Sequence, residues 1–375
     1  MRILVVSSIM PPEIGGPASY VPEIINRLGN KHEFKVVTFT PSAEKVRGVE
    51  TISVSQTGGT IGRQLRLVKI VLQKGSWADV IYAQDPLVVG LAANLAAFLV
   101  NKPVVIKFVG DPAWEEAFGK GITTKFLDDF LKDPSDAGWG GKLNILLTRI
   151  SFVLAKKIIT PSKYIGSVVT GPYKINPAKV VPIYNAIEIP KIVKLKKENK
   201  IFTIVTPMGR LVKWKKVDEV IKAVSVINSE KKNHVRLLVL GDGPESDSLK
   251  ELARGENVEF LGKKTREEGL RILANSDLFV LNSVYEGLPH TVLEAFAVGT
   301  PVVATDIPGT NEIAINNQTA LTIKPGDTDG LVKAIENIKN DHKLVRKLTF
   351  SGFRLVSSRF GWEANLRLLN QIFGK

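Results

Sequence analysis

The chain has 375 residues, of which 44% are hydrophobic and 23% charged, and its net charge at neutral pH is +14. This length predicts two or three domains with large buried cores, and the composition excludes disordered, collagen-like and coiled-coil proteins as the main class. The absence of cysteine excludes disulfides, thiolate nucleophiles and cysteine-ligated metal centres. The positive charge favours anionic partners such as nucleotides, phosphates or anionic lipids, although it could serve solubility alone.

The first half of the chain alternates short β-branched runs with longer amphipathic segments. We expect strands at residues 3–7, 35–39, 79–83, 104–109, 157–160 and 180–183, and helices at residues 18–28, 61–74, 86–99 and 143–155. Near-continuous Val and Ile strands separated by helices favour a parallel sheet covered on both faces. The N-terminal apolar stretch is too short for a signal peptide, and the longest apolar run, residues 87–100, is too short to span a bilayer. We therefore expect a cytoplasmic protein.

Residues 190–200 are lysine-rich and lack a clean period, which indicates a linker. The alternation then restarts, with strands expected at 202–206, 235–240, 258–261, 278–282, 302–305 and 320–323, and helices at 217–228, 245–254, 266–275, 290–298 and from 330 onward. The pattern predicts an α/β protein with two doubly wound, Rossmann-like domains that face a cleft. We place these domains at residues 1–187 and 188–359. Ligands of such sheets bind beyond the carboxyl ends of the strands, so the cleft is the expected site.

Two glycine-containing turns follow expected strands. Gly15 and Gly16 stand where the first strand meets a helix, and such a turn lets backbone amides approach an anion, although a simple tight turn explains it nearly as well. Gly209 and Arg210 follow the strand at 202–206, with Lys215 five residues on. Arginine and lysine are natural ligands of a diphosphate, and the alternative is a solvated basic loop.

The segment from Glu286 to Glu294 is the strongest signal. A Gly-Pro loop carries Glu286, a helix is expected to start near Pro289, and Glu294 falls in its second turn. Free amides at residues 290–292 and the helix dipole favour a phosphate. The two carboxylates could accept hydrogen bonds from sugar hydroxyls. Glu294 alone could be a surface charge, but the joint pattern argues against that reading.

Taken together, the motifs at 12–16, 209–215, 241–243, 260–262, 286–294 and 299–303 resemble the retaining glycosyltransferases of family 4. This is the glycogen-synthase-like group with the GT-B fold, and Glu286 and Glu294 match its E-x7-E signature. The resemblance implies a nucleotide-diphospho-sugar donor held by the C-terminal domain and an acceptor on the N-terminal domain. It also implies a last helix, at 360–375, that packs back on the N-terminal domain. A metal ion or other cofactor is not implied.

The resemblance also implies roles for single residues. Arg210 and Lys215 would bind the diphosphate and stabilise the charge that builds on it as it leaves. Glu294 would take the ribose hydroxyls, and Glu286 would lie near the donor sugar. The implied donor-binding residues are Gly16, Gly209, Arg210, Lys215, Gly262, Lys263, Glu286, His290, Thr291, Val292, Leu293 and Glu294. The implied catalytic set is Glu286, Arg210, Lys215 and Asp111.

Two departures from the family pattern stand out. The family often has a histidine near the donor sugar, and Gly110 occupies that position here. Asp111 is then the nearest polar group, and it could either contact sugar hydroxyls or cap the following helix. Lys216 replaces a glycine that often follows the lysine matching Lys215.

The expected function is transfer of a sugar, with retention of anomeric configuration and without a metal, from a nucleotide sugar to a glycan or lipid-linked acceptor. The alternatives are a nucleotide-sugar epimerase or a non-catalytic sugar-binding relative on the same fold. Nucleic-acid binding has only the net charge in its favour and is not expected. The sequence fixes neither the donor base and sugar nor the linkage.

Two basic amphipathic segments bear on membrane contact. Arg63, Arg66, Lys69 and Lys74 line one side of one helix, and Lys142, Arg149 and Lys156 recur every seven residues in another. Such helices can lie on an anionic membrane surface, or they can be ordinary surface helices with a buried face.

Overall fold

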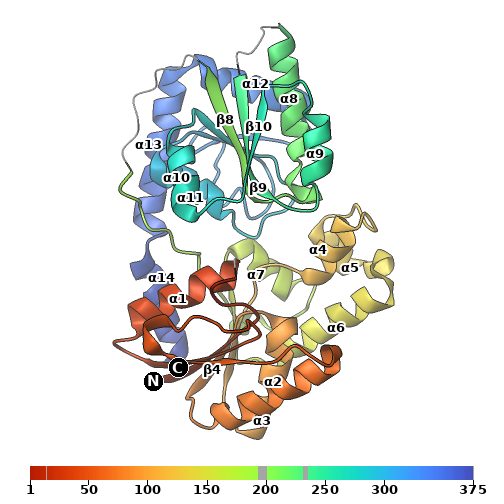
Figure 1. The fold of residues 1–375 in the computed structure, drawn as a ribbon, viewed down its shortest axis with the longest axis vertical. Helices are drawn as coiled ribbons and strands as arrows, with labels where there is room; N and C mark the ends of the chain where they lie inside the picture. Colours follow the sequence, from red (N-terminus) through yellow and green to blue (C-terminus); the bar gives the residue numbers. More distant parts are fainter. Residues whose placement is uncertain (14, 193–200, 231–234, 375) are drawn as a thin grey trace. The chain divides into compact units, whose positions relative to one another are not determined.

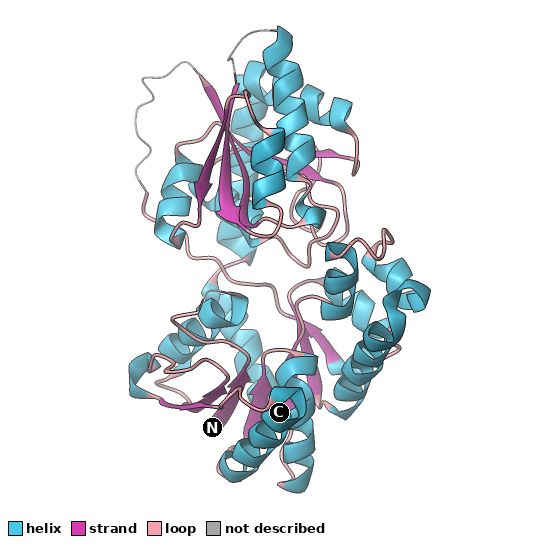
Figure 2. Ribbon diagram, turned by 45° about the vertical axis from the view of Figure 1, so that its right-hand side comes forward, coloured by secondary structure: helices cyan, strands magenta, loops and turns pink. Residues whose placement is uncertain are grey.

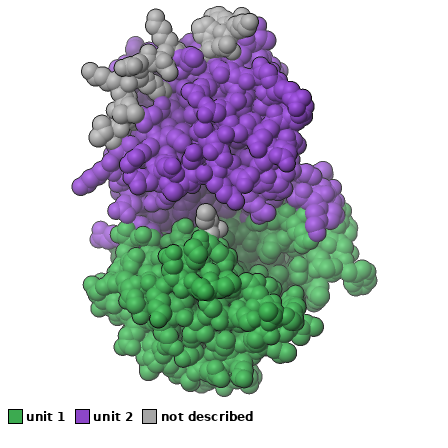
Figure 3. Space-filling view, in the orientation of Figure 1, with its two compact units in different colours: residues 1–117, 127–183, 365–375 green, residues 118–126, 184–364 purple. Residues whose placement is uncertain are grey.

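The computed structural model describes residues 1–13, 15–192, 201–230 and 235–374, so part of the expected linker, residues 193–200, lies outside the described residues. The chain forms two compact units, coloured separately in Figure 3. Unit 1 comprises residues 1–117, 127–183 and 365–375, and unit 2 comprises residues 118–126 and 184–364. The segment 118–126, which lies within the expected N-terminal domain in sequence, thus belongs to unit 2.

Unit 1 is built on a seven-stranded sheet in the order β3-β2-β1-β4-β5-β6-β7, with all neighbours parallel. Its strands are β1 (Arg2–Ser7), β2 (Glu33–Thr38), β3 (Glu50–Ser53), β4 (Val80–Ala83), β5 (Val104–Lys107), β6 (Lys157–Thr160) and β7 (Val180–Pro182). The central strands β4 and β5 are buried at every position, which explains their apolar sequences up to Lys107, the buried last residue of β5. Strand β3 was not predicted, because it is a short edge strand with polar residues at both ends.

Helices connect these strands (Figures 1 and 2). They are α1 (Gly16–Leu28), α2 (Gly59–Gly75), α3 (Leu91–Leu99), α4 (Pro112–Gly119), α5 (Leu127–Lys132), α6 (Gly138–Leu154) and α7 (Lys163–Thr170). The helix expected at 86–99 begins instead with a π-helical turn, η2 (Pro86–Gly90), and the Asp85 side chain caps it by accepting from the amides of Val88 and Val89. Helices α4 and α5 were not predicted, and α6 starts five residues before the expected position.

The C-terminal helix α14 (Trp362–Phe373) belongs to unit 1 from residue 365 onward. His32 Nε2 lies 2.6 Å from Asn370 Oδ1. The ring of Phe373 packs edge-on against Tyr82 of β4, with 5.3 Å between the centroids. The end of the chain therefore completes the core of the unit that contains its beginning.

Unit 2 repeats the architecture with a six-stranded sheet in the order β10-β9-β8-β11-β12-β13. The strands are β8 (Phe202–Arg210), β9 (Val235–Asp242), β10 (Val258–Gly262), β11 (Leu278–Leu281), β12 (Val302–Thr305) and β13 (Leu321–Ile323). The helices are α8 (Val217–Glu230), α9 (Ser246–Leu252), α10 (Arg266–Ala274), α11 (His290–Val298), α12 (Thr328–Asn340) and α13 (His342–Arg359). Separate apolar clusters cover the two faces of this sheet. The prediction of two doubly wound α/β folds is confirmed.

Candidate functional site

The strand order of unit 2 reverses between β8 and β11, since β9 and β10 lie on one side of this pair and β12 and β13 on the other. In open parallel sheets, ligands bind outside the carboxyl ends of the strands at such a switch point. The two loops that leave β8 and β11 are the loops that carry Lys215 and Glu286. The topology therefore brings together motifs that lie more than 70 residues apart.

The end of β8 runs very close to the end of β9. Gly209 pairs with Gly241, which has a φ of 136°, and a Cβ added at Gly241 would overlap the Gly209 carbonyl oxygen. Glycine is therefore required at Gly241. A Cβ added at Gly209 would meet open space instead. Arg210, the last residue of β8, is exposed beside this open position.

Beyond β8 the chain makes a tight turn, η5 (Lys213–Lys215), that is tied to the loop after β11. The Val284 amide donates to the Trp214 carbonyl at 2.8 Å. Lys215 Nζ lies 2.5 Å from Glu286 Oε1, and the two side chains are only 17% and 12% exposed. The loop of Glu286 is supported from its other side, because Gly309 approaches the Glu286 carbonyl so closely that no Cβ would fit. Two sequence-predicted residues thus form one nearly buried ion pair.

Helix α11 starts after Pro289 without a side-chain cap. The Val292 amide is not free as expected, because it donates to the Pro289 carbonyl at 3.2 Å. Among the described residues the Thr291 amide donates to none. His290 is exposed, while the side chains of Val292 and Leu293 are buried in the core. The Thr291 amide can therefore donate a hydrogen bond to a negative group at this helix end.

Glu294 lies in the second turn of α11 and is buried. Burial raises the pKa of its carboxyl, and Arg266 opposes that rise. Arg266 Nε lies 3.0 Å from Glu294 Oε1, and the arginine side chain is 55% exposed. Sequence reasoning missed Arg266. Its only signal was its place at the start of α10, directly after the capping residue Thr265.

Gly262 is the last residue of the edge strand β10, and Lys263 follows it at the same end of the sheet. Gly262 has a φ of 65°, and Lys263 Nζ lies 3.6 Å from Asp242 Oδ2 at the end of β9. The Ser246 hydroxyl and the Gly243 amide lower the pKa of Asp242. The carboxyl ends of β8, β10 and β11 therefore carry the predicted donor residues of unit 2.

The two remaining predicted residues belong to unit 1. Gly16 is exposed at the first position of α1, and a Cβ there would meet nothing within 4 Å. Asp111 is fully buried. Its Oδ1 accepts from the Trp114 amide at 2.9 Å, and its Oδ2 accepts from the Tyr173 hydroxyl. Burial raises the pKa of Asp111, and these bonds oppose the rise. Both carboxylate oxygens of Asp111 are thus engaged within unit 1, one of them in capping α4, and its place in the catalytic set stays a prediction.

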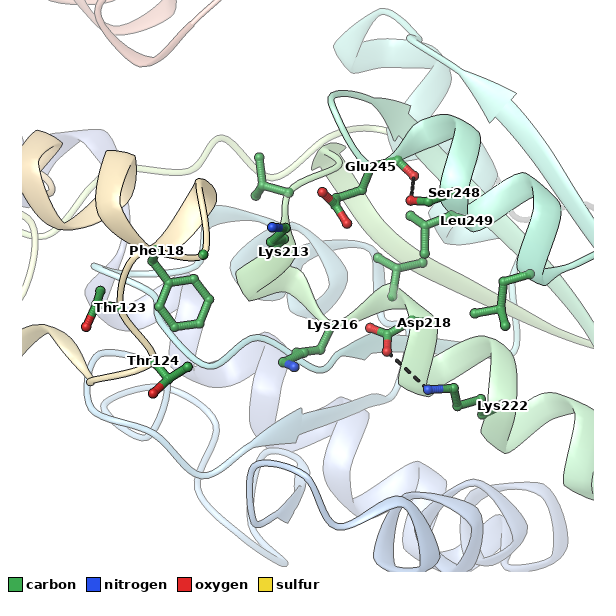
Figure 4. A pocket seen from close by; sticks show the side chains of 14 residues that line it. Phe118, Thr123, Thr124, Lys213, Lys216, Asp218, Lys222, Glu245, Ser248 and Leu249 are labelled. Atoms are coloured by element: carbon green, nitrogen blue, oxygen red, sulfur yellow. Dashed lines mark hydrogen bonds and ion pairs between the residues drawn. The ribbon is translucent and has the colours of Figure 1, made fainter. Parts of the chain in front are cut away.

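A cavity of about 510 Å³ lies on another side of the η5 turn and is lined by residues of unit 2. Figure 4 shows Lys213 and Lys216 on its wall, together with Phe118, Asp218 and Glu245. Arg210, Lys215, Glu286 and Glu294 are not among its lining residues. The lysines that flank Lys215 in sequence therefore serve a different surface.

Comparisons with known proteins agree with this architecture. Residues 14–190 match the family model described as Glycosyltransferase Family 4, and residues 187–352 match the model described as Glycosyl transferases group 1. The lipopolysaccharide core biosynthesis glycosyltransferase LpsE of Rhizobium meliloti is 34% identical over 165 residues, which span 43% of this chain and 46% of LpsE. Glycogen synthase of Mycobacterium tuberculosis is 26% identical over an alignment that covers 100% of this chain and 94% of that protein.

Among solved structures, Anabaena Alr3699/HepE in complex with UDP and glucose has a TM-score of 0.77 over 100% of both chains, at 19% identity. Two Rossmann-like units in one chain form the architecture of the GT-B fold. The matching family models together span most of the sequence. The chain belongs to glycosyltransferase family 4, in the glycogen-synthase-like group.

Proposed function

We propose that this chain transfers a sugar, with retention of anomeric configuration and without a metal ion, from a nucleotide-diphospho-sugar to a glycan or lipid-linked acceptor. The observation that carries the proposal is the Lys215–Glu286 pair, which joins the loops at the switch point of unit 2. A cation and a carboxylate held there, close in sequence to the open end of α11, suit a bound diphosphate with a sugar attached.

The departure of a nucleoside diphosphate builds negative charge on its phosphates. Lys215 and the exposed Arg210 would stabilise that charge, and the Thr291 amide at the start of α11 would add a hydrogen bond. Glu286 holds the Lys215 ammonium in place before the donor arrives. Because Glu286 accepts only through one oxygen in this pair, its other oxygen would be available to a hydroxyl of the donor sugar. The acceptor would attack from the face on which the diphosphate leaves.

Glu294 would accept hydrogen bonds from the ribose hydroxyls, and the backbone at Gly262 and Lys263 would meet the base. In the structure Glu294 already has a partner in Arg266. Arg266 is half-exposed and long, so it can turn toward a phosphate when ribose takes its place on Glu294. The backbone of Gly16 would also take part in donor binding, and a Cβ at this position would meet nothing within 4 Å.

UDP-sugars are the first donors to test, because UDP is bound in the HepE structure. The name of LpsE supports an acceptor that is part of a lipid-linked glycan. We place the reaction in the cytoplasm, as expected from the sequence. Nucleotide-sugar epimerisation is the competing activity, and it would use the same donor site without an acceptor.

The experiment incubates the full chain with UDP-, GDP- and ADP-sugars, with and without oligosaccharide and glycolipid acceptors, in the presence of EDTA. Two results would support the proposal. Nucleoside diphosphate should be released only when an acceptor is present, and an NMR coupling constant of the product should show the same anomeric configuration as in the donor. Arg210→Ala should lose this activity, whereas Arg254→Ala, a change at an exposed arginine just after α9, should keep it. Conversion of the donor sugar without an acceptor would instead identify an epimerase.

A further inference from the structure

Helix α6 presents an apolar stripe to solvent. Trp139 is 93% exposed, Leu143 53%, Leu146 50%, Ile150 39% and Val153 53%. These residues follow one another at spacings of four, three, four and three, so they lie along one face of the helix. The opposite face, with Thr148, Ser151 and Phe152, is buried in unit 1. The helix therefore has one buried face and, opposite it, an apolar face that is not covered within unit 1.

The neighbouring helices extend this surface. Helix α3 packs against both α2 and α6, and Asn94 of α3 donates to the Ser151 carbonyl of α6 at 3.0 Å. The exposed residues of α3 are also apolar, and Phe98 is 82% exposed. On α2, Ile61 and Leu65 are 78% and 65% exposed. Single exposed apolar residues are common on protein surfaces, but here they occur on three helices that pack together. Such a group of exposed apolar side chains marks an interaction site.

The charge of this three-helix surface has one sign only. The sequences of α2, α3 and α6 contain no Asp or Glu, whereas α2 and α6 carry lysine and arginine. Several of these basic groups are used locally, since Arg66 donates to the Ser55 carbonyl and Lys74 pairs with Glu50. Lys69 and Lys142 are exposed and have no partner among the described residues. Apolar side chains are thus accompanied by unneutralised positive charge.

We propose that the surface formed by α2, α3 and α6 binds unit 1 to the face of an anionic lipid bilayer. The apolar side chains would enter the boundary between headgroups and acyl chains, and Lys69 and Lys142 would contact anionic headgroups. Trp139 has the amphipathic ring that favours this interface. Among the described residues, no helix is both long and apolar enough to cross a membrane. The contact would therefore be peripheral.

Lipid fits this surface better than a second copy of the chain. Self-association through this surface would place lysines of one copy against those of the other, with no carboxylate on the three helices to pair with them. An anionic bilayer supplies both the apolar layer and the negative charge. The inference does not depend on the proposed sugar transfer, because it rests on residues of unit 1 that have no assigned role in it.

The experiment measures flotation of the full chain with vesicles of phosphatidylcholine alone or mixed with phosphatidylglycerol. The wild type should bind the mixed vesicles, and the triple variant Leu143→Gln/Leu146→Gln/Ile150→Gln should bind at least about tenfold more weakly. The matched control Val226→Gln/Phe350→Gln changes residues of unit 2 that are 48% and 69% exposed, and it should bind like the wild type. Lys69→Glu/Lys142→Glu should lose the preference for anionic vesicles.

Fluorescence quenching by brominated lipid then tests whether the helix enters the bilayer. Quenching should be strong in the wild type and mostly lost in Trp139→Phe, which keeps the other tryptophans of the chain. Failure to bind the mixed vesicles, or equal binding by the folded Gln triple variant, would overturn the proposal. A stable dimer that this triple variant dissociates, without vesicle binding, would overturn it in favour of self-association. Donor turnover can be measured without vesicles, so failure here is distinct from failure of the proposed transferase function.

Discussion

Lys215 Nζ and Glu286 Oε1 lie 2.5 Å apart, and this nearly buried pair joins the loop after β8 to the loop after β11. Each side chain sits at the carboxyl end of a strand beside the switch point of unit 2. The pair is therefore both a structural tie and, under the proposed function, a preformed part of the donor site.

Loss of one partner should destabilise unit 2. Lys215→Met leaves the Glu286 carboxylate mostly buried and without its partner. Glu286→Gln leaves the Lys215 ammonium mostly buried and without its partner. We expect each to cost about 2–4 kcal/mol of unfolding free energy, measured by urea denaturation. In the double variant neither charge is left alone, so its cost should be smaller than the sum of the two single costs. Additive costs would show that the pair does not interact in solution.

Glu294 should make stability depend on pH. Burial raises its pKa in the folded state above the ordinary 4.5, so the folded protein binds this proton more tightly than the unfolded chain does. The resulting stability is present below pH 4.5 and is lost as the pH rises through the raised pKa. Glu294→Gln removes this loss, so its stability relative to the wild type should increase with pH across that range. Parallel curves for the two proteins would contradict the raised pKa.

The ion pair with Arg266 should moderate the same effect. Arg266→Ala removes the positive charge that opposes the rise in the Glu294 pKa. The pH window over which stability is lost should therefore extend to higher pH in this variant. Arg271→Ala, at another exposed arginine of α10, is the control and should leave the window unchanged. Unfolding free energies measured by urea at several pH values decide between these outcomes.

Gly241 and Gly209 should respond differently to alanine. At Gly241 the φ of 136° and the overlap with the Gly209 carbonyl both oppose a side chain, so Gly241→Ala should cost about 3 kcal/mol or more. At Gly209 a methyl group points into open space, so Gly209→Ala should change stability by less than about 0.5 kcal/mol. Thermal unfolding compares the two, and equal stability of both variants would show that β8 and β9 separate readily here.

Phe373 should anchor the end of the chain in unit 1. It is 2% exposed and packs against Tyr82, so Phe373→Ala should cost about 3 kcal/mol. Phe350→Ala, at a residue of α13 that is 69% exposed, should have almost no effect. If denaturation found the two variants equally stable, the last helix would contribute little to unit 1.

Much of the fold could be predicted because local patterns determine it. The short, mostly apolar and β-branched sequences of β4, β5, β11 and β12 favour fully buried parallel strands. Helix α11 carried its own start at Pro289 and its end at Gly299. By contrast, β3 has only four residues at an edge, and α5 has six, so neither carries enough periodicity to detect.

The candidate site could be predicted where its residues lie close together in the sequence, as they do from Glu286 to Glu294. The contact of Arg266 with Glu294 joins two helices and leaves no periodic trace in the sequence. For Asp111 the sequence allowed a cap of the following helix, which the Trp114 amide bond shows, but it gave no sign of the second contact with Tyr173, 62 residues away. On α6, Phe152 packs inward and Ile150 is exposed. The sequence could not predict this difference, because both side chains are apolar.

The most direct test of the central claim is calorimetric titration of the full chain with UDP, GDP and ADP in the presence of EDTA. We predict that one nucleoside diphosphate binds, and that Arg210→Ala and Glu294→Gln each weaken its binding by about tenfold or more, whereas Arg254→Ala does not. Absence of binding by all three nucleotides, or binding that neither site variant weakens, would contradict a donor site at the switch point of unit 2.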